Sequence, residues 1–254
     1  MDIDKIVREQ FRLDTNCIEE NPIGININRR LKHKGARYFE EISDFFRAIV
    51  YRGTLYMMCD DSIYDWALEY YGDRAPEWFC KFSNLRILEQ KLAKQGYGIL
   101  DTHVYFLPDT EYEGYDFNCP YEIKWYEKED ILKIKGNPFR NALMYYKDCP
   151  DELSVGALNK DGEPVAMAGV SSDSEKLWQI GIDVLPEYRH RGLALYLVTL
   201  LKDRVLEEGR VPFYGTSESH SLSQRVAIRS GFIPSWCEIY CKKMDIKDQQ
   251  NSQQ

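Results

Sequence analysis

The sequence has no stretch of about 18 consecutive apolar residues, the length that a membrane-spanning helix needs. Its first residues, MDIDKIVREQF, also lack the apolar core of a secretion signal. Positive charge is not in excess either, because 41 acidic residues against 33 basic ones give a formal net charge of −8. We therefore expect a cytoplasmic protein with no membrane partner. The lack of a net positive charge also disfavours a nucleic-acid-binding module.

Metal-binding signatures and the common nucleotide-binding signatures are missing as well. The seven cysteines include no CxxC pair, and no histidine lies near Cys237 and Cys241 to complete a zinc site. We expect buried free thiols and no metal. The sequence also contains no GxxxxGK(S/T), GxGxxG, HExxH or GxSxG motif, which excludes the usual P-loop, dinucleotide, zinc-protease and serine-hydrolase sites.

Core-forming residues are plentiful, since 44% of the chain is hydrophobic and 13% is aromatic. Alternating and helical periodicities predict an α/β fold with an α+β mixed sheet. In the front part we predict elements in β-α-β-α-β order at 54–59, 62–71, 78–82, 85–95 and 98–106. Further on we predict strands at 121–126, 153–159, 164–172, 177–184, 211–217 and 232–243, and helices from about Lys128 and at 192–208 and 222–230.

The segment PDTEYEGYDFNCP at 108–120 is rich in turn-forming and acidic residues, and it separates two differently patterned parts. We therefore predict an N-terminal α/β lobe at 1–117, a second domain at 118–245 and a disordered polar tail at 246–254. Within the second domain, the composition of NKDGE at 159–163 predicts a hairpin turn between two strands.

The stretch from Ile182 to Ala194 carries the chemistry. A strand ends near Val184, a proline follows, and after one tight turn a largely apolar helix begins at about Gly192. The start of such a helix presents unpaired backbone N–H groups and about half a positive charge to one point. Gly192 and Ala194 leave room for close approach, and the segment Arg189-His190-Arg191 adds positive charge. This pattern predicts a site for a phosphate ester.

The same residues form the pattern Arg-x-x-Gly-x-Ala, which resembles the pyrophosphate-binding motif Gln/Arg-x-x-Gly-x-Gly/Ala of the GNAT family of N-acetyltransferases. About 30 residues later, the run from Ser223 to Gly231-Phe232 resembles the family's second cofactor-side helix. The resemblance covers about residues 118–245. The whole chain resembles a bacterial GNAT subgroup with a long N-terminal extension.

This resemblance implies the GNAT acyl-CoA N-acyltransferase fold and acetyl-CoA as co-substrate. It implies direct transfer of the acetyl group to an amine of a small molecule or peptide. The strand residues Ile182, Asp183 and Val184 would face the pantetheine arm. The backbone amides from His190 to Ala194 would hold the pyrophosphate. The residues that we predict to bind the co-substrate are Ile182, Asp183, Val184, Arg189, His190, Arg191, Gly192, Leu193, Ala194 and Ser223.

The resemblance does not extend to the catalytic groups. Ala227 stands where the family commonly has a tyrosine that protonates the leaving thiolate, and His220 stands where it commonly has an asparagine. Trp178 occupies the register of the strand glutamate that some members use as a base. We therefore name Glu218 and His220 as catalytic candidates, because a carboxylate and an imidazole both suit proton transfer near neutral pH. Helix-start roles remain the alternative for both.

Several alternatives stay open from the sequence. The front lobe is either a degenerate second GNAT-like half or an unrelated cap that shapes the acceptor pocket. Its aromatic residues either line a pocket or form a core stripe; these are Trp66, Tyr70, Tyr71, Trp78 and Phe79. Arg225 and Arg229 either reach a phosphate of CoA or form a solvated helix face. The alternative function is a catalytically weak acyl-CoA-binding regulatory protein. A homodimer also stays open.

Overall fold

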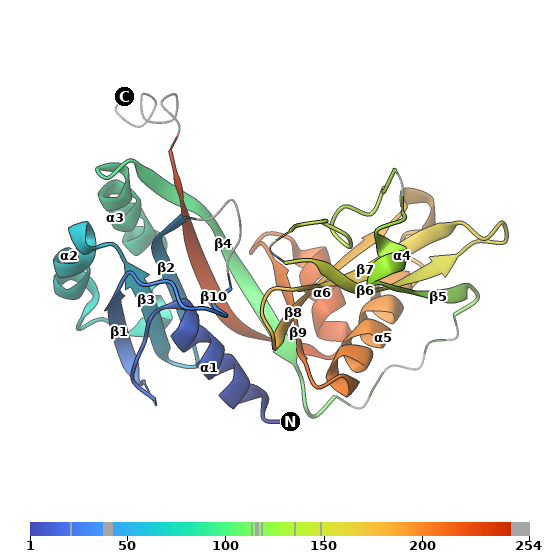
Figure 1. Ribbon diagram of the computed structural model, residues 1–254, viewed down its shortest axis with the longest axis horizontal. Helices are drawn as coiled ribbons and strands as arrows, with labels where there is room; N and C mark the ends of the chain where they lie inside the picture. The colour runs from blue at the N-terminus through green and yellow to red at the C-terminus, as the bar shows by residue number, and fades with distance from the viewer. Residues whose placement is uncertain are drawn as a thin grey trace. The chain divides into compact units, whose positions relative to one another are not determined.

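The computed structural model describes residues 1–20, 22–37, 43–112, 114, 117, 119–134, 136–147 and 149–244. Helices are interspersed among strands that pair both in parallel and antiparallel, so the α/β fold with a mixed sheet is confirmed (Figure 1). Contacts divide the chain into two compact units. We call Asp4–Val104 with Ser235–Gln254 the N-terminal unit, and Met1–Ile3 with Tyr105–Pro234 the C-terminal unit.

The compact units follow packing rather than chain order. The chain passes from one unit to the other within strand β4 (Tyr97–Pro108) and again within strand β10 (Phe232–Lys243). The domain limits at 1–117 and 118–245 stay a prediction. The predicted disordered tail at 246–254 lies outside the described residues.

The N-terminal unit is a sheet with the strand order β1-β3-β2-β10-β4. Strand β1 runs parallel to β3, whereas β2 is antiparallel to both β3 and β10. The remaining elements of the unit are β1 Gly24–Arg29, β2 Ser43–Tyr51, β3 Thr54–Cys59, α1 Ile3–Asp14, α2 Asp61–Tyr71 and α3 Phe82–Ala93.

Strand β3 is buried along its whole length because helices cover both of its faces. Leu55 and Met57 belong to one core cluster with residues of α2 and α3. Tyr56 points to the opposite face, as the alternation of a strand requires, and its ring lies 5.9 Å from the ring of Phe11 in α1. A strand covered on both faces carries no polar face, which explains the continuous apolar run TLYMMC.

A buried cluster of four charged side chains lies on the α1 side of this sheet. Arg37 donates from Nε to Asp14 Oδ2 at 2.7 Å, and its Nη2 lies 3.1 Å from Glu238 Oε2. Arg47 donates from Nε to Glu238 Oε1 at 2.5 Å. Trp236 donates its indole N–H to the same carboxylate at 3.1 Å. The side chains of Arg37, Asp14 and Glu238 are completely inaccessible to solvent, so the cluster balances charge inside the unit.

The strand predicted at 78–82 is wrong. A 3-10 helix spans Pro76–Trp78, and α3 begins at Phe82. Proline suits the first turn of a helix, and Asn84 Nδ2 donates to the Trp78 carbonyl at 2.7 Å, which holds the chain in a turn. The front part therefore lacks the middle strand of its predicted β-α-β-α-β order. The element order consequently no longer supports a degenerate GNAT-like lobe.

The C-terminal unit has the strand order β4-β9-β8-β7-β6-β5. Strands β5 to β8 form an antiparallel meander, and β8 then pairs with β9 in parallel. The elements are β5 Glu122–Glu127, β6 Asp151–Leu158, β7 Pro164–Ser172, β8 Leu177–Val184, β9 Val211–Thr216, α4 Lys128–Ile131, α5 Leu193–Glu207 and α6 Ser221–Arg229.

Helix α5 makes the crossover that a parallel strand pair needs, and it packs against β6, β7, β8 and β9. It also contacts α6 (Figure 1). The hairpin turn predicted at 159–163 is confirmed, because the side chain of Asn159 accepts hydrogen bonds from the backbone N–H groups of Asp161 and Glu163 at 2.9 Å. The sheet and the two helices together determine where the ends of β8 and β9 meet the starts of α5 and α6.

Candidate functional site

Strands β8 and β9 separate halfway along β8. Their described pairing runs from Leu177 opposite Val211 to Ile180 opposite Tyr214 and ends there. Strand β8 continues to Val184 paired with β7 alone. The edge of β8 after Ile180 therefore presents backbone N–H and C=O groups that β9 does not pair in the described register, and an extended ligand can add to such an edge.

A cavity of about 500 Å³ opens at this separation. Strand β8, strand β9 and the first turns of α5 and α6 all contribute to its walls. The structure brings ten of the predicted site residues together there: Ile182, Asp183, Val184, Arg189, His190, Gly192, Leu193, Ala194, His220 and Ser223. The cavity wall also includes Asn141, Tyr188, Leu195, Tyr214, Leu222, Arg225, Val226 and Arg229.

The first turn of α5 supplies hydrogen-bond donors to the cavity. Gly192 is the N-cap residue, and no side chain caps the helix there. The first intrahelical bond of this turn runs from Tyr196 N to Gly192 O, so the backbone N–H groups of Leu193, Ala194 and Leu195 precede the helical ladder. All three residues line the cavity. Because the helix dipole adds partial positive charge at this end, the turn can bind an anion.

The structure gives two reasons why residue 192 is a glycine. Its φ of +81° lies in the left-handed region, which favours glycine. A Cβ at this position would also lie 2.5 Å from Cε2 of Phe117. The Phe117 ring packs against Tyr196 in α5, with 5.2 Å between the ring centroids. The residue therefore shapes the turn and admits an aromatic ring, in addition to leaving space for a ligand.

The two arginines before Gly192 have different positions. Arg191 donates to the hydroxyl of Tyr121 at 2.9 Å and to the carbonyl of Glu187 at 3.0 Å, and it is not among the residues that line the cavity. Arg189 lines the cavity and donates from Nε to the Val184 carbonyl at 3.1 Å. Arg191 therefore holds the turn from outside. The side-chain charge beside the helix start comes from Arg189.

The carboxylate of Asp183 is occupied by the protein itself. It accepts hydrogen bonds from Asn141 N at 2.6 Å, Asn141 Nδ2 at 2.6 Å and Ala142 N at 3.0 Å. A contribution of Asp183 to co-substrate binding can therefore come only from its backbone while these bonds persist. These bonds hold the loop that contains Asn141 and Ala142, and Asn141 lines the cavity.

Glycines allow this loop to lie directly on the sheet. Gly169 in β7 and Gly181 in β8 are paired partners. A Cβ on Gly181 would overlap the Asn141 carbonyl, and a Cβ on Gly169 would overlap the Ala142 carbonyl. Gly181 therefore allows a close approach between the sheet and the backbone of the loop.

The two catalytic candidates are placed differently. His220 lies exposed at the start of α6, lines the cavity, and has Nδ1 3.5 Å from the Thr216 hydroxyl. Glu218 does not line the cavity, and its carbonyl accepts a hydrogen bond from Gln224 Nε2 at 2.9 Å. Ala227 is completely buried, and its methyl side chain has no proton to donate. The catalytic roles of Glu218 and His220 remain predictions.

Tyr214, which the sequence did not single out, also lines the cavity. Its side chain is 3% exposed, and its Oη lies 2.8 Å from Ser223 Oγ in the first turn of α6. Burial raises the pKa of Tyr214, the hydrogen bond with Ser223 lowers it, and the net pKa is above the ordinary value. A family motif read along α6 could not find this group, because it comes from the neighbouring strand.

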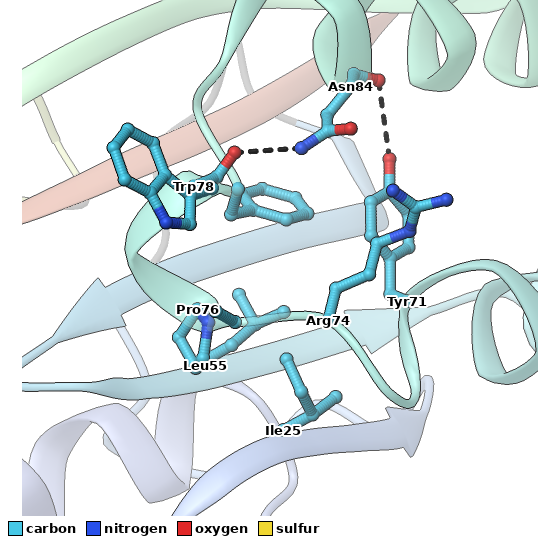
Figure 2. A pocket seen from close by; sticks show the side chains of 9 residues that line it. Ile25, Leu55, Tyr71, Arg74, Pro76, Trp78 and Asn84 are labelled. Atoms are coloured by element: carbon cyan, nitrogen blue, oxygen red, sulfur yellow. Dashed lines mark hydrogen bonds between the residues drawn. The ribbon is translucent and has the colours of Figure 1, made fainter.

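A second cavity, of about 190 Å³, lies within the N-terminal unit (Figure 2). Tyr71, Trp78 and Phe79 line it, whereas Trp66 and Tyr70 stack on each other. Figure 2 shows the amide of Asn84 donating to the Trp78 carbonyl and the Tyr71 hydroxyl donating to the Asn84 carbonyl. Because its walls are mainly apolar and aromatic, we assign the candidate site to the larger cavity.

Within the described residues, no group of three or more His, Cys, Asp or Glu side chains is arranged to hold a metal ion. None of the helices in the described part of the chain is long and apolar enough to cross a membrane.

Comparison with known proteins shows which proteins and which family this chain resembles. Among curated proteins, none matches the chain. Similar solved structures include a GNAT-family protein from Novosphingobium aromaticivorans, at 20% identity over 59% of this chain and 68% of that one, with a TM-score of 0.43. A GCN5-related N-acetyltransferase-like protein from Streptococcus suis matches at 16% identity over 64% of this chain and 68% of that one, with a TM-score of 0.46.

A tandem GNAT protein from the clavulanic acid biosynthesis pathway matches at 13% identity over 59% of this chain and 55% of that one, with a TM-score of 0.43. Likenesses this distant carry no argument about substrate. The model of the acetyltransferase (GNAT) family matches residues 116–232, which include β8, α5, β9, α6 and the cavity between them. Residues 116–232, a little under half of the chain, therefore resemble the acetyltransferase (GNAT) family.

Proposed function

We propose that the C-terminal unit binds acetyl-CoA and transfers the acetyl group directly to an amine of a small molecule or peptide, as an N-acetyltransferase. One observation carries the proposal: the open start of α5 and the unpaired edge of β8 line the same cavity of about 500 Å³. An anion-binding helix end next to a free strand edge suits a ligand with a pyrophosphate at one end and an amide-bearing arm at the other. A cytoplasmic location belongs to the proposal.

Each part of the co-substrate has matching groups. The backbone amides from His190 to Ala194 would hold the pyrophosphate, and the edge from Ile182 to Val184 would pair with the pantetheine arm. Arg225 and Arg229 also line the cavity, and their side chains would add positive charge for phosphates. This local concentration of cationic groups stands out in a chain with a net charge of −8.

Direct transfer needs the amine held against the thioester carbonyl and its proton removed. Holding the two reactants in one cavity supplies much of the acceleration, which reaches about 7–11 kcal/mol in the best intramolecular cases. His220 is the better placed of the two proposed bases, because it lines the cavity and Glu218 does not.

Thermal unfolding with and without acetyl-CoA tests the proposal. Ligand at about 100 times its dissociation constant stabilises a protein by about 2.7 kcal/mol, which corresponds to a rise in Tm of about 5–10 °C at this size. Substituting Gly192 would strain the backbone and meet Phe117, so the blocking variant is Ala194→Glu. A glutamate in the first turn of a helix is compatible with the dipole, but it repels a phosphate.

The matched control is Leu132→Glu, which adds the same charge at an exposed position that does not line the cavity. We expect the rise in Tm for the wild type and for Leu132→Glu, and no rise for Ala194→Glu. No rise in the wild type at saturating acetyl-CoA would refute the proposal.

A second candidate function is favoured by the buried Ala227, which leaves α6 without the family's usual acid. It is a catalytically weak acyl-CoA-binding regulatory protein. Release of free thiol from acetyl-CoA in the presence of a panel of primary amines and peptides separates the two functions. An enzyme releases thiol in proportion to the acetylated amine, whereas a regulator shows the rise in Tm without turnover.

A further inference from the structure

We propose that Tyr214 is the proton donor for the leaving sulfur in this site. The inference rests on the proposed function and deepens it, because it names the residue that performs a step for which α6 provides no group. Tyr214 lies at the separation of β8 and β9, is enclosed by the protein, and is hydrogen-bonded to Ser223.

Tyr214 stands where the two strands separate. It is the last residue of β9 that pairs with β8 in the described register, opposite Ile180. Immediately beyond this pair, the unpaired edge of β8 begins. The next residue, Gly215, faces the other side of the sheet, where a Cβ would lie 2.6 Å from Cε1 of Tyr105. Alternation along the strand therefore directs Tyr214 toward α6 and the cavity.

Enclosure keeps the phenol protonated. Only 3% of Tyr214 is exposed, and burial raises its pKa above the ordinary tyrosine value. The charge of Asp183 raises it further. At neutral pH the group therefore carries a proton that it can give. The hydroxyl is itself buried, and a directed hydrogen bond is stronger there than in water.

Ser223 stabilises the phenolate that proton donation creates. Its Oγ lies 2.8 Å from Tyr214 Oη and belongs to the third residue of α6. As Tyr214 loses its proton, the Ser223 hydroxyl can donate to the phenolate oxygen, and the positive end of α6 favours the negative charge. Ser223 is thus a positioning residue for Tyr214.

The other groups in the cavity are less suited to this step. The Asp183 carboxylate is engaged by Asn141 and Ala142. His220 is exposed at the start of α6, on the solvent side of the cavity. Ala227 lies one helical turn after Ser223 and has no ionisable group. Tyr214 is therefore the enclosed hydroxyl nearest to the strand separation among the described residues that line the cavity.

The step balances as follows. The amine nitrogen forms the new N–C bond, the C–S bond breaks, and its electron pair goes to sulfur. Tyr214 gives its O–H proton to that sulfur, which leaves as the thiol. The amine nitrogen loses one proton to the proposed base His220, and a proton returns from that base to the Tyr214 phenolate through water. The products are the N-acetyl amine and CoA, with no net change in the protein.

Binding tests the inference without turnover. In alkaline solution, where the thiol of CoA ionises, a donor at the sulfur position should favour CoA over the analogue that lacks the sulfur, desulfo-CoA. We expect the wild type to bind CoA about tenfold to hundredfold more tightly than desulfo-CoA by calorimetry, the range typical of a hydrogen bond to a charged acceptor.

The variants are Tyr214→Phe, Ser223→Ala and the control Tyr126→Phe, which removes the hydroxyl of a buried tyrosine in β5 that does not line the cavity. Tyr214→Phe should lose the preference for CoA and keep its affinity for desulfo-CoA, which also shows that the variant is folded. Ser223→Ala should reduce the preference. Tyr126→Phe should bind both molecules like the wild type.

Kinetics supply a second readout, with hydroxylamine as probe nucleophile and release of thiol as signal. General acid catalysis contributes about 10²–10⁴-fold, so Tyr214→Phe should lower kcat by at least about 100-fold with little change in KM for acetyl-CoA. Retention of the CoA preference in Tyr214→Phe, or a kcat within threefold of wild type, overturns the role of Tyr214 alone. Failure of the wild type to bind either molecule overturns the proposed function, and this inference with it.

Discussion

Replacing Glu238 by glutamine tests the buried charge cluster of the N-terminal unit. Glutamine keeps the shape of the side chain but removes the negative charge that Arg37, Arg47 and Trp236 contact. The two guanidinium groups would then share the single remaining carboxylate of Asp14. Removing one partner from a buried ion pair costs about 3–5 kcal/mol, because a charge is left buried without compensation. That is a large share of the roughly 5–15 kcal/mol by which a typical domain is stable.

Urea unfolding at pH 7, followed by tryptophan fluorescence, measures the effect directly. We expect Glu238→Gln to lower the unfolding free energy by about 3–5 kcal/mol, with an unchanged dependence on denaturant. The matched control is Glu208→Gln, which makes the same chemical change in a surface pair with Arg204. The control should unfold nearly like the wild type. If Glu238→Gln unfolds like the control, the cluster does not stabilise the unit as argued.

The pH dependence of the unfolding free energy tests the same charge cluster independently. Burial raises the pKa of Glu238, but Arg37 and Arg47 lower it more, so the pKa in the folded protein lies below the ordinary glutamate value. A depressed folded pKa contributes stability that is present above the unfolded pKa and lost as pH falls through the folded pKa. The difference between wild type and Glu238→Gln should therefore shrink below about pH 4.5. A constant difference down to pH 3 would contradict this origin.

Two further predictions concern packing and thiol chemistry. Gly181→Ala should lower the unfolding free energy more than Gly156→Ala in urea titrations. A Cβ at Gly181 meets the backbone of Asn141, whereas a Cβ at Gly156 comes no closer than 3.3 Å to Tyr126. Equal losses of unfolding free energy would mean that the loop does not rest on the sheet. Burial raises the pKa of both Cys59 and Cys241 to about 12, so only about one thiol in 10⁴ is ionised at pH 8. Mass spectrometry after alkylation at that pH should find both unmodified until denaturant is added, and rapid labelling of the folded protein would contradict their burial.

The sequence predicted the elements around the site well because their patterns are strong and local. The predicted strand at 164–172 coincides with β7, the strand at 177–184 coincides with β8, and the final strand at 232–243 coincides with β10. Strand, proline, glycine and apolar helix follow one another within about 30 residues, so neighbouring residues determine each boundary. The anion-binding turn could be predicted for the same reason: its donors are backbone groups of one short segment.

The N-terminal elements were harder to predict, because tertiary contacts determine them. Strand β2 was not predicted, and its buried Arg47 is stabilised by Glu238, which is 191 residues away in the chain. A charged residue in an otherwise apolar segment weakens the strand pattern until its partner is known. Helix α1 was also missed, since its polar residues outnumber the few that it buries. At 78–82 a strand was predicted that does not form. The aromatic residues of this segment suggested a buried strand, but Trp78 and Phe82 are exposed.

The catalytic groups show most clearly why a motif predicts a binding site better than it predicts chemistry. Binding of a phosphate group at a helix start depends on backbone amides, so the order of glycine and small residues is enough to predict where such a site would lie. A proton donor depends only on where an oxygen lies, and different elements can bring an oxygen to the same place. Counting along α6 leads to Ala227, which has no proton to give. The adjacent strand places the Tyr214 hydroxyl against the same helix, 2.8 Å from Ser223. A vacancy in a sequence motif is therefore evidence of a lost activity only when neighbouring elements also lack a suitable group, and here β9 provides one.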